Sequence, residues 1–506
     1  MKVADKRKSL RLAPLLFFSV VFLYAPAGST QGQNPGRQDQ PQPQPEMPDR
    51  SVVYIHAVNR HVLTDQPFGL PAVEEKTGSA FVLKNKYIVT DIELVRYAVS
   101  LEIRKYPQGP SFPGRVVVLG YDCGLAFVTV DNPAFFSDIP GLDLSDVMPG
   151  PGTIVQVIGF EGNTARPLVL NYPVINSDFS FIENSDADRR RIFNIQPSTA
   201  VPSLLTGGPV IFQGKIVGLF HTKEKTYVIH SSVVLHMMED HADGRYDGFP
   251  SAAFTFSPVE NPYLQSYFGM TAAGIQGGIL VDRVGPFENM RGVLQAGDII
   301  FRIGTYSFNS TGQVVVGTEN VEFLDYLNRL QSDRVWVSIL RRGKPLEKEQ
   351  TLPLNTDAAF SWKRKSIFQN RKYFMSAGLA FQELDYDVMH DTRAGSLLGN
   401  QYRYGYYIQD SPSDTPDRYV VLTSRLEDPI NSGSEIFIGG TVQSINGRRV
   451  RDLAEFAREW KAAQTRYIVL HFYDQPLPLV IDNQGLAEKD AALEKKFSLQ
   501  ENGRVR

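Results

Sequence analysis

Short runs of β-branched and aromatic residues, interrupted by glycine, proline and asparagine, fill most of residues 51–242. The clearest runs are 52–55, 78–83, 87–90, 114–119, 125–130, 153–159 and 192–195. Strand signals of this density favour closed barrels or a sandwich over a parallel sheet covered by helices. A stretch of roughly 190 residues is long enough for two packed barrels. We therefore expect a mainly β fold here.

The total length of 506 residues exceeds what one hydrophobic core supports, so we expect two or three domains and additional tails. An apolar fraction of 42% and a charged fraction of 21% are typical of a globular protein. The net charge of −3 includes a surplus of basic residues at the start, so the rest of the chain is more acidic than this total. This balance argues against a nucleic-acid-binding protein.

The first 27 residues have the order of a secretory signal peptide. Basic residues precede an apolar run at 12–24, and Ala25-Pro26-Ala27 is a small-residue cleavage pattern. The run is short for a membrane span, although an uncleaved anchor is the alternative. We expect export after cleavage behind Ala27, with no stable membrane span afterwards. The expected location is the periplasm, with secretion or the cell surface as alternatives, and residues 28–50 form a Gln/Pro-rich flexible spacer.

The strands and turns of residues 51–245 resemble those of the HtrA/DegP family of trypsin-like serine proteases. Four blocks in the family's order carry the resemblance: 77–83, 87–95, 118–126, and 206–219, which begins Thr206-Gly207-Gly208-Pro209. The resemblance implies a chymotrypsin-like double β-barrel and an assembly of identical subunits, a trimer in most of the family.

The three catalytic positions of that family are all substituted. Glu93 stands where the family has a histidine base, Gly124 where it has an aspartate, and Thr206 where it has the serine nucleophile. A hydroxyl is a poor nucleophile without a base that a third group orients. If Glu93 is ionised in a solvated cleft, it is a weak base at neutral pH, and Gly124 can orient nothing. We expect a protease fold that has lost its hydrolytic chemistry.

The oxyanion loop is altered as well, because Leu204 and Leu205 replace the family's glycine and asparagine. A bulky residue at 204 disfavours the backbone twist that aims the amides at an oxyanion. The alternative is an active serine-type endopeptidase of protein quality control, in which Thr206 uses an unrecognised base. The first histidine to consider is His221, which closes the strand after Gly218.

Residues 260–355 resemble a PDZ domain, with Ala296-Gly297-Asp298-Ile299-Ile300 as the most specific block. The segment Tyr267-Phe268-Gly269-Met270 matches the loop whose amides capture a peptide carboxylate, beside which the ligand adds as a strand. Residues 321–330 have helical spacing, so Val321 and Leu324 are predicted to wall the groove, although such a stripe also fits plain core.

Residues 356–373 form a basic segment, interpreted as a solvated linker. Residues 374–484 resemble a second, divergent PDZ-like domain, in which 440–450 is the firmest part and 393–418 looks inserted. A charged tail, 485–506, follows. The predicted architecture is thus a double β-barrel and two α+β PDZ domains.

The lone Cys123 excludes an intrachain disulfide, and its apolar surroundings predict a small buried side chain. No metal site or cofactor is predicted. The expected function is an exported, HtrA-like pseudo-protease that binds peptide C-termini or unfolded proteins as a chaperone-like or regulatory scaffold. A secreted or surface interaction protein is the third alternative.

Overall fold

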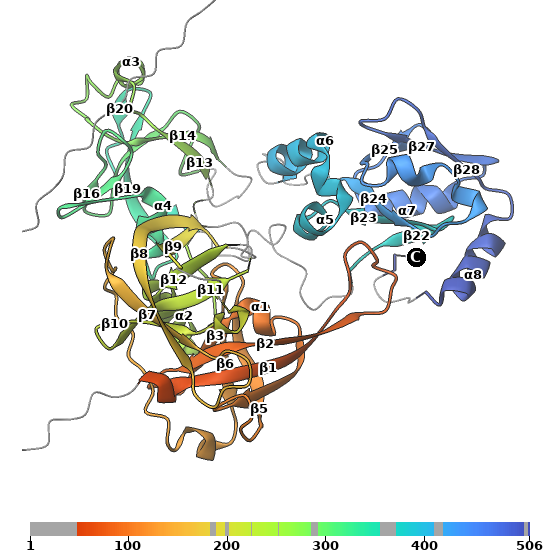
Figure 1. Ribbon diagram of the computed structural model, residues 1–506. Coiled ribbons are helices and arrows are strands. Elements are labelled where there is room, and N and C mark those ends of the chain that lie inside the picture. The colour runs from red at the N-terminus through yellow and green to blue at the C-terminus, as the bar shows by residue number, and fades with distance from the viewer. Residues whose placement is uncertain are drawn as a thin grey trace, which may run out of the picture. The chain divides into compact units, whose positions relative to one another are not determined.

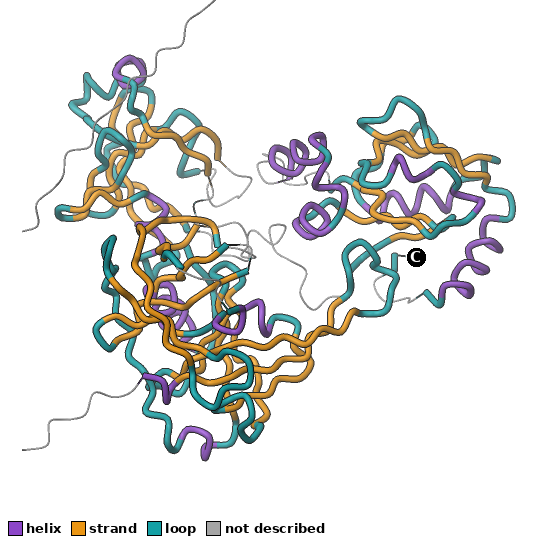
Figure 2. Tube along the Cα trace, viewed as in Figure 1, coloured by secondary structure: helices purple, strands orange, loops and turns teal. Residues whose placement is uncertain are grey.

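The structure, a computed structural model, describes residues 48–182, 189–197, 202–223, 225–250, 252, 254–284, 292–354, 371–408, 418–499 and 504–505. All of these residues belong to one compact unit, which lies within Glu46–Arg506. The predicted signal peptide and nearly all of the spacer therefore lie outside the described residues. Strands dominate up to residue 230, and the helices are short (Figure 2).

The strands between residues 52 and 230 form two closed six-stranded barrels (Figure 1). This confirms the predicted mainly β, chymotrypsin-like fold. The first barrel has the strand order β1-β2-β3-β6-β5-β4 and the second β10-β11-β12-β9-β8-β7. Their strands are β1 (Val52–His61), β2 (Ala72–Val82), β3 (Ile88–Asp91), β4 (Ala98–Arg104), β5 (Phe112–Gly120), β6 (Leu125–Val130), β7 (Ile154–Gly159), β8 (Leu168–Phe181), β9 (Arg189–Ile195), β10 (Pro209–Phe212), β11 (Lys215–Thr222) and β12 (Thr226–His230).

Alternation along the strands builds each barrel interior. In β1, Val53, Ile55 and Ala57 are fully buried, whereas Tyr54 and His56 between them are partly exposed. Residues of both barrels join in one shared apolar cluster, which includes Phe81, Phe127 and Leu219. Burial of this shared surface holds the barrels against each other and fixes the loops at their junction.

Short helices close the barrel ends: η1 (Pro48–Ser51), α1 (Ile92–Val95), η2 (Pro133–Phe136), η3 (Ser203–Leu205), α2 (Ser231–Asp240) and η4 (His241–Asp243). The polar stretch at the second barrel contributes to two strands, residues 177–181 to β8 and residues 189–191 to β9. Arg190 is buried there, 4.1 Å above the Phe249 ring and 3.4 Å from Asp122. The stacking and the ion pair compensate for burial of its charge.

The first PDZ region has one main sheet with β13, β14, β15, β19 and β20 in this order. Its elements are β13 (Phe254–Pro258), α3 (Pro262–Tyr267), β14 (Ile279–Val284), β15 (Ile299–Ile303), β16 (Tyr306–Ser307), β17 (Val314–Val316), β18 (Glu319–Val321), α4 (Phe323–Asn328), β19 (Arg334–Arg341), β20 (Lys344–Pro345) and β21 (Gln350–Pro353). The buried Asp298 of the specific block accepts two hydrogen bonds from Arg341, at 2.8 and 2.7 Å. This bidentate pair ties β15 to β19.

The second PDZ region contains two sheets, ordered β22-β23-β24 and β26-β25-β27-β28. Its elements are β22 (Phe374–Ser376), β23 (Leu379–Glu383), α5 (Tyr386–Asp391), η6 (Arg393–Ser396), α6 (Leu398–Tyr402), η7 (Arg403–Ile408), β24 (Val420–Arg425), η8 (Pro429–Asn431), η9 (Ser434–Phe437), β25 (Val442–Ile445), β26 (Arg448–Arg449), α7 (Leu453–Ala462), β27 (Tyr467–Phe472), β28 (Leu479–Asp482) and α8 (Leu486–Phe497). One aromatic-rich core joins both sheets to α7 through Phe381, Phe456 and Trp460.

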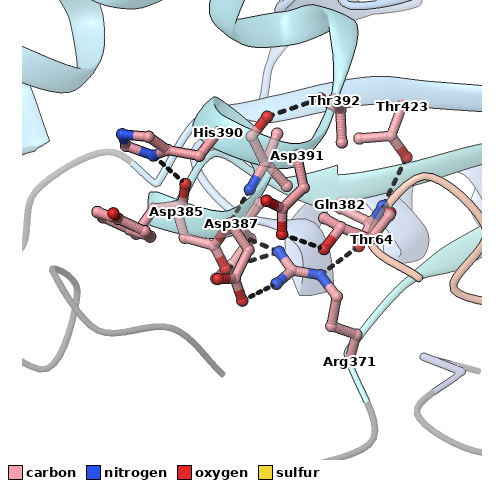
Figure 3. A network of polar contacts seen from close by, with 12 residues as sticks. Thr64, Arg371, Gln382, Asp385, Asp387, His390, Asp391, Thr392 and Thr423 are labelled. Atoms are coloured by element: carbon pink, nitrogen blue, oxygen red, sulfur yellow. Dashed lines mark hydrogen bonds and ion pairs between the residues drawn. The ribbon is translucent and has the colours of Figure 1, made fainter. Parts of the chain in front are cut away.

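Two predicted boundaries of this region are wrong. Leu486 of α8 belongs to its apolar core, so the chain beyond 484 is not a separate tail. At the other end, Arg371 is buried rather than solvated, and its guanidinium donates to Asp385, Asp387 and Gln382 (Figure 3). The rest of the predicted linker, 356–370, lies outside the described residues.

Candidate functional site

The three positions that the resemblance assigns to a triad lie in short segments beside the barrel strands. Glu93 is in α1, which begins directly after β3 because Asp91 caps its first turn. Gly124 precedes β6, and Thr206 ends η3 just before β10. Each residue thus follows or precedes a barrel strand at the end where active-site loops of such folds lie.

Glu93 is buried, with 6% of its surface exposed, so its carboxylate does not lie in a solvated cleft. Its carboxylate lies 2.7 Å from Arg96 Nη1, 3.8 Å from Lys76 Nζ and 3.5 Å from Lys223 Nζ. Three cations thus surround the group that stands in the position of the family's base. These ion pairs compensate for burial of the carboxylate in the first turn of α1.

The Thr206 hydroxyl donates a hydrogen bond to the carbonyl oxygen of Thr222, at 3.0 Å. Its backbone amide donates to the carbonyl oxygen of Ser203, at 3.1 Å, within the turn of η3. In a trypsin-like protease the amide of the nucleophilic residue faces the developing oxyanion. In this structure both polar groups that Thr206 would need for catalysis are bound elsewhere.

Leu204 and Leu205 fasten this loop to both barrels. The Leu205 side chain is fully buried in the core of the second barrel. The Leu204 carbonyl oxygen accepts a hydrogen bond of 2.7 Å from the Ser79 hydroxyl of β2. Burial of a leucine side chain contributes about 2 kcal/mol, which favours the 3₁₀ turn over an extended loop with free amides.

Gly124 leaves no room for a carboxylate. Its φ is +71°, in the left-handed region, and a Cβ atom there would lie 2.8 Å from Ile182 Cγ2. Its carbonyl oxygen accepts a hydrogen bond from the Ile92 amide, at 3.0 Å. The backbone at 124 therefore supports the start of α1 and offers no side-chain chemistry.

A buried pair that the sequence indicated only in part lies beside this loop. His221 Nδ1 is 2.6 Å from Asp91 Oδ2, and both side chains are 2% exposed. The imidazole stacks on the Tyr227 ring at 4.7 Å, and Asp91 Oδ1 accepts from the Glu93 amide at 2.8 Å. His221 was singled out in the sequence, whereas Asp91 was not. The signal for Asp91 was its position as a helix N-cap between a strand and an apolar turn.

Such a pair has the chemistry of an oriented imidazole, because a carboxylate on Nδ1 fixes the ring and its tautomer. The imidazole of this pair belongs to His221 on β11, one residue before Thr222. The carbonyl oxygen of Thr222 accepts the hydrogen bond from the Thr206 hydroxyl. The described contacts of the Thr206 hydroxyl are to this carbonyl and not to the imidazole.

Gly207 and Gly208 are required by packing between the barrels. A Cβ atom at 207 would lie 2.2 Å from the Ser79 carbonyl oxygen, and one at 208 would lie 2.3 Å from that of Ile158. The φ of Gly207 is +85°. No side chain fits at either position, so this turn is needed whether or not the neighbouring residue is a nucleophile.

The predicted carboxylate loop of the first PDZ region is the end of helix α3 and its cap. The amides of Phe268, Gly269 and Met270 donate to the carbonyls of residues 264, 266 and 265. Met270 is fully buried, whereas Tyr267 is exposed. These amides are therefore not presented to a ligand in this structure, in contrast to the open Gly turn that we expected.

The two predicted groove residues of this region lie on different elements. Val321 is buried at the end of strand β18 and not in a helix, which corrects that expectation. Leu324 lies on α4, as predicted, and packs against the core of the region. The helix is shorter than the predicted 321–330 because Glu322 precedes its first turn with extended backbone.

Other candidate groups are structural. The Cys123 side chain is fully buried, as predicted, and burial raises the pKa of its thiol, so it is not a reactive nucleophile. In the described ranges, no cluster of three or more His, Cys, Asp or Glu side chains could hold a metal ion. No helix in the part of the chain that the structure describes is long and apolar enough to cross a membrane.

Comparison with known proteins supports this architecture. A family model for the PDZ domain matches residues 363–502. Protease Do-like 4, mitochondrial, of Arabidopsis thaliana is 25% identical over 416 residues, which cover 80% of this chain and 75% of the relative. Protease Do-like 2, chloroplastic, of the same plant is 23% identical over 419 residues, 79% of this chain and 65% of the relative.

The chain is similar in organisation to these Do-like proteases. A trypsin-like protease fold is followed by a PDZ domain, and the match through residue 502 agrees with the packing of α8 in the core. Among solved structures, the HtrA-type protease AlgW with decapeptide covers 61% of this chain and 96% of its own, at 15% identity and a TM-score of 0.44. The serine endoprotease from Yersinia pestis covers 61% of this chain and 95% of its own, at 16% identity and a TM-score of 0.41.

Proposed function

We propose that this HtrA-type chain is a pseudo-protease that binds peptides or unfolded protein segments and acts as a chaperone-like or regulatory scaffold. The hydrogen bonding of Thr206 is the observation that carries the proposal. Its hydroxyl donates to the Thr222 carbonyl oxygen and its amide to that of Ser203, while the Glu93 carboxylate is paired with three cations. A hydroxyl without an accepting base, next to an amide that cannot face an oxyanion, gives little rate enhancement.

The test is incubation of the mature chain with unfolded, fluorescently labelled casein. The proposal predicts binding, read as a rise in anisotropy, and suppression of casein aggregation without release of labelled fragments. The Thr206→Ala variant should bind casein as the unaltered chain does. Cleavage that disappears in Thr206→Ala would overturn the proposal, and absence of both binding and cleavage would overturn its peptide-binding part.

An active serine-type endopeptidase is a second candidate, favoured by one observation. The buried His221 and Asp91 side chains form a 2.6 Å pair near the loop that carries Thr206. A threonine hydroxyl that turned from Thr222 to this imidazole would gain a base that a carboxylate orients. In the casein assay this candidate predicts cleavage that both Thr206→Ala and His221→Gln abolish.

The expected location and assembly belong to the same proposal. We infer export to the periplasm, and a homo-oligomer, a trimer by resemblance to the family. A secreted or surface interaction protein is the third alternative. Labelling of intact cells with a reagent that does not cross membranes separates these cases, because the reagent reaches a surface protein but not a periplasmic one.

A further inference from the structure

Tyr373, the residue directly before β22, makes a short parallel strand contact with the chain's own residues 504 and 505. β22 is the terminal strand in the order β22-β23-β24, so one of its edges is not paired with another strand of this sheet. Arg504 pairs with Tyr373 in a parallel bridge, and the Val505 amide donates to the Tyr373 carbonyl oxygen at 2.8 Å. Main-chain pairing of this kind is how sheet edges recognise extended peptides.

Side chains add selectivity to this backbone contact. Arg504 Nη1 lies 2.5 Å from Glu494 Oε1 of α8, and its Nη2 donates to the Met375 carbonyl oxygen at 3.1 Å. Val505 packs against the apolar core of the second PDZ region. The site therefore accepts an arginine through a carboxylate and a carbonyl, and then an aliphatic side chain through apolar contact.

The edge is held in place by groups that do not belong to the bound segment. The Ser376 hydroxyl and the Ala377 amide donate to the Asp490 carboxylate of α8, at 2.5 and 2.6 Å. Trp460 of α7 donates its indole N–H to the Ser376 hydroxyl at 3.1 Å. Because α7 and α8 hold this edge in place before a ligand binds, binding loses less conformational entropy.

A cavity of about 460 Å³ adjoins the segment and gives room for further ligand residues. β22, α7 and α8 line it, with Phe374, Trp460, Lys461, Leu486 and Asp490 among its walls. Arg504 and Val505 also line it, and its walls combine aromatic and apolar side chains with polar and charged ones, which suits peptide side chains of both kinds.

We propose that the outer edge of β22 is a strand-addition site for an extended segment of another polypeptide in which an arginine precedes an aliphatic residue. The chain's own Arg504 and Val505 occupy it in this structure. The charge complementarity to Glu494, the strand pairing with Tyr373 and the adjoining cavity carry the assignment. The inference deepens the proposed peptide binding and rests on it for its use in the cell, whereas the site itself is tested separately.

The probe is a fluorescein-labelled peptide with the sequence of residues 498–506, Ser-Leu-Gln-Glu-Asn-Gly-Arg-Val-Arg. Two variants open the edge: a chain that ends at Leu499, and the full chain with Arg504→Glu. Both should bind the probe at least tenfold more tightly than the unaltered chain, because a tethered segment competes at an effective concentration in the millimolar range. The Arg504→Glu variant keeps α8 and the full length, so it answers the question even where the shortened chain fails to fold.

Two altered probes test the chemistry on the opened chains. A probe with glutamate in place of the arginine should bind at least tenfold more weakly, and Glu494→Lys, in the chain that ends at Leu499, should restore its binding. A probe with N-methylvaline, which lacks the amide that donates to Tyr373, should also lose binding. Equal binding of all probes, or equal binding by opened and unaltered chains, overturns the proposal.

Sedimentation of the full chain tests a second copy as the occupant. A dimer that Arg504→Glu dissociates would show that the segment is exchanged between copies and would overturn the proposed ligand. Probe binding without casein binding would support the β22 site and reject the broader peptide-binding function. Casein binding without probe binding would support the broader function and reject the β22 site.

Discussion

At the residue scale, Gly124 makes the clearest prediction about the three positions that the resemblance assigns to a triad. Gly124→Ala should lower the free energy of unfolding by about 3 kcal/mol, because it adds strain at a positive φ to a close contact with Ile182. The matched control is Gly274→Ala, whose φ of +70° is the same but where a Cβ atom meets nothing within 4 Å. It should cost only about 1 to 2 kcal/mol. Denaturant unfolding measures both, and equal losses would show that Ile182 moves aside.

The buried His230 predicts a dependence of stability on pH. Its Nδ1 accepts a hydrogen bond from the Ser232 amide at 3.2 Å and so caps α2, which requires the neutral ring. Burial lowers the pKa of His230 from 6.5 to about 4. The unfolded chain therefore takes up a proton near pH 6.5 and the folded chain only near pH 4. Stability is fully present above pH 6.5 and falls by about 2 to 3 kcal/mol as the pH drops to 4.

His230→Asn should flatten this pH dependence, because asparagine can accept the capping hydrogen bond but does not titrate in this range. Thermal unfolding at pH 4, 5, 6 and 7 measures the difference. His471→Asn, on the exposed face of β27, is the matched control for loss of a histidine. A variant slope equal to that of the unaltered chain would contradict the assigned role of His230.

Sequence reasoning at this scale identified the positions of the site but not their surroundings. The blocks around Glu93, Gly124 and Thr206 could be found because strand and turn patterns are local. Of the cations around Glu93, Arg96 lies only three residues away, whereas Lys76 comes from β2 and Lys223 from the chain after β11. The two distant pairings leave no local signal in the sequence, and the same holds for Asp91 with His221.

At the element scale, Arg371 and its partners show how one charge fixes the start of the second PDZ region. Arg371→Met should cost about 3 to 5 kcal/mol, because it leaves the carboxylates of Asp385 and Asp387 near the interior without a cation. Adding Asp385→Asn and Asp387→Asn should recover part of the loss, and asparagine can still cap α5 at 385. Chemical denaturation of the second PDZ region checks this, and no recovery would contradict the electrostatic explanation.

At the same scale, the buried face of helix α8 was not recognised from its composition. The chain beyond 484 is rich in Lys, Glu and Asp, which is typical of a solvated tail. Its two buried leucines, Leu486 and Leu493, are seven residues apart and therefore lie on one face of α8. So narrow an apolar face does not stand out in a charged sequence, whereas the β-branched strands of the barrels were predicted correctly.

At the scale of the whole molecule, the β1–β2 hairpin reaches the second PDZ region. Phe68 packs with Tyr373 and Met375, and the Thr64 carbonyl oxygen accepts a hydrogen bond of 2.7 Å from the buried Gln382 (Figure 3). The tip of the hairpin, residues 62–71, reads as an ordinary turn in the sequence. Its partner lies about 300 residues further along the chain, so this contact could not be predicted.

Phe68→Ala should destabilise the second PDZ region by about 3 kcal/mol, because it removes an aromatic ring from a small apolar cluster. Calorimetry should show that part of the heat absorption moves to a lower temperature while the transition of the barrels keeps its midpoint. Leu70→Ala, in the same hairpin but 75% exposed, is the control and should change neither. An identical effect of the two variants would contradict a specific role for Phe68.

The hydrogen bond from the Thr206 hydroxyl to Thr222 also has a practical consequence for surveys of living cells. Fluorophosphonate probes label serine hydrolases through an activated oxygen, and this oxygen is bound to a backbone carbonyl. We expect the chain to stay unlabelled at probe concentrations that saturate an active HtrA-type protease, as read by in-gel fluorescence. A census of proteases by reactivity would then overlook this protein, although its Gly-Gly-Pro turn resembles theirs in sequence.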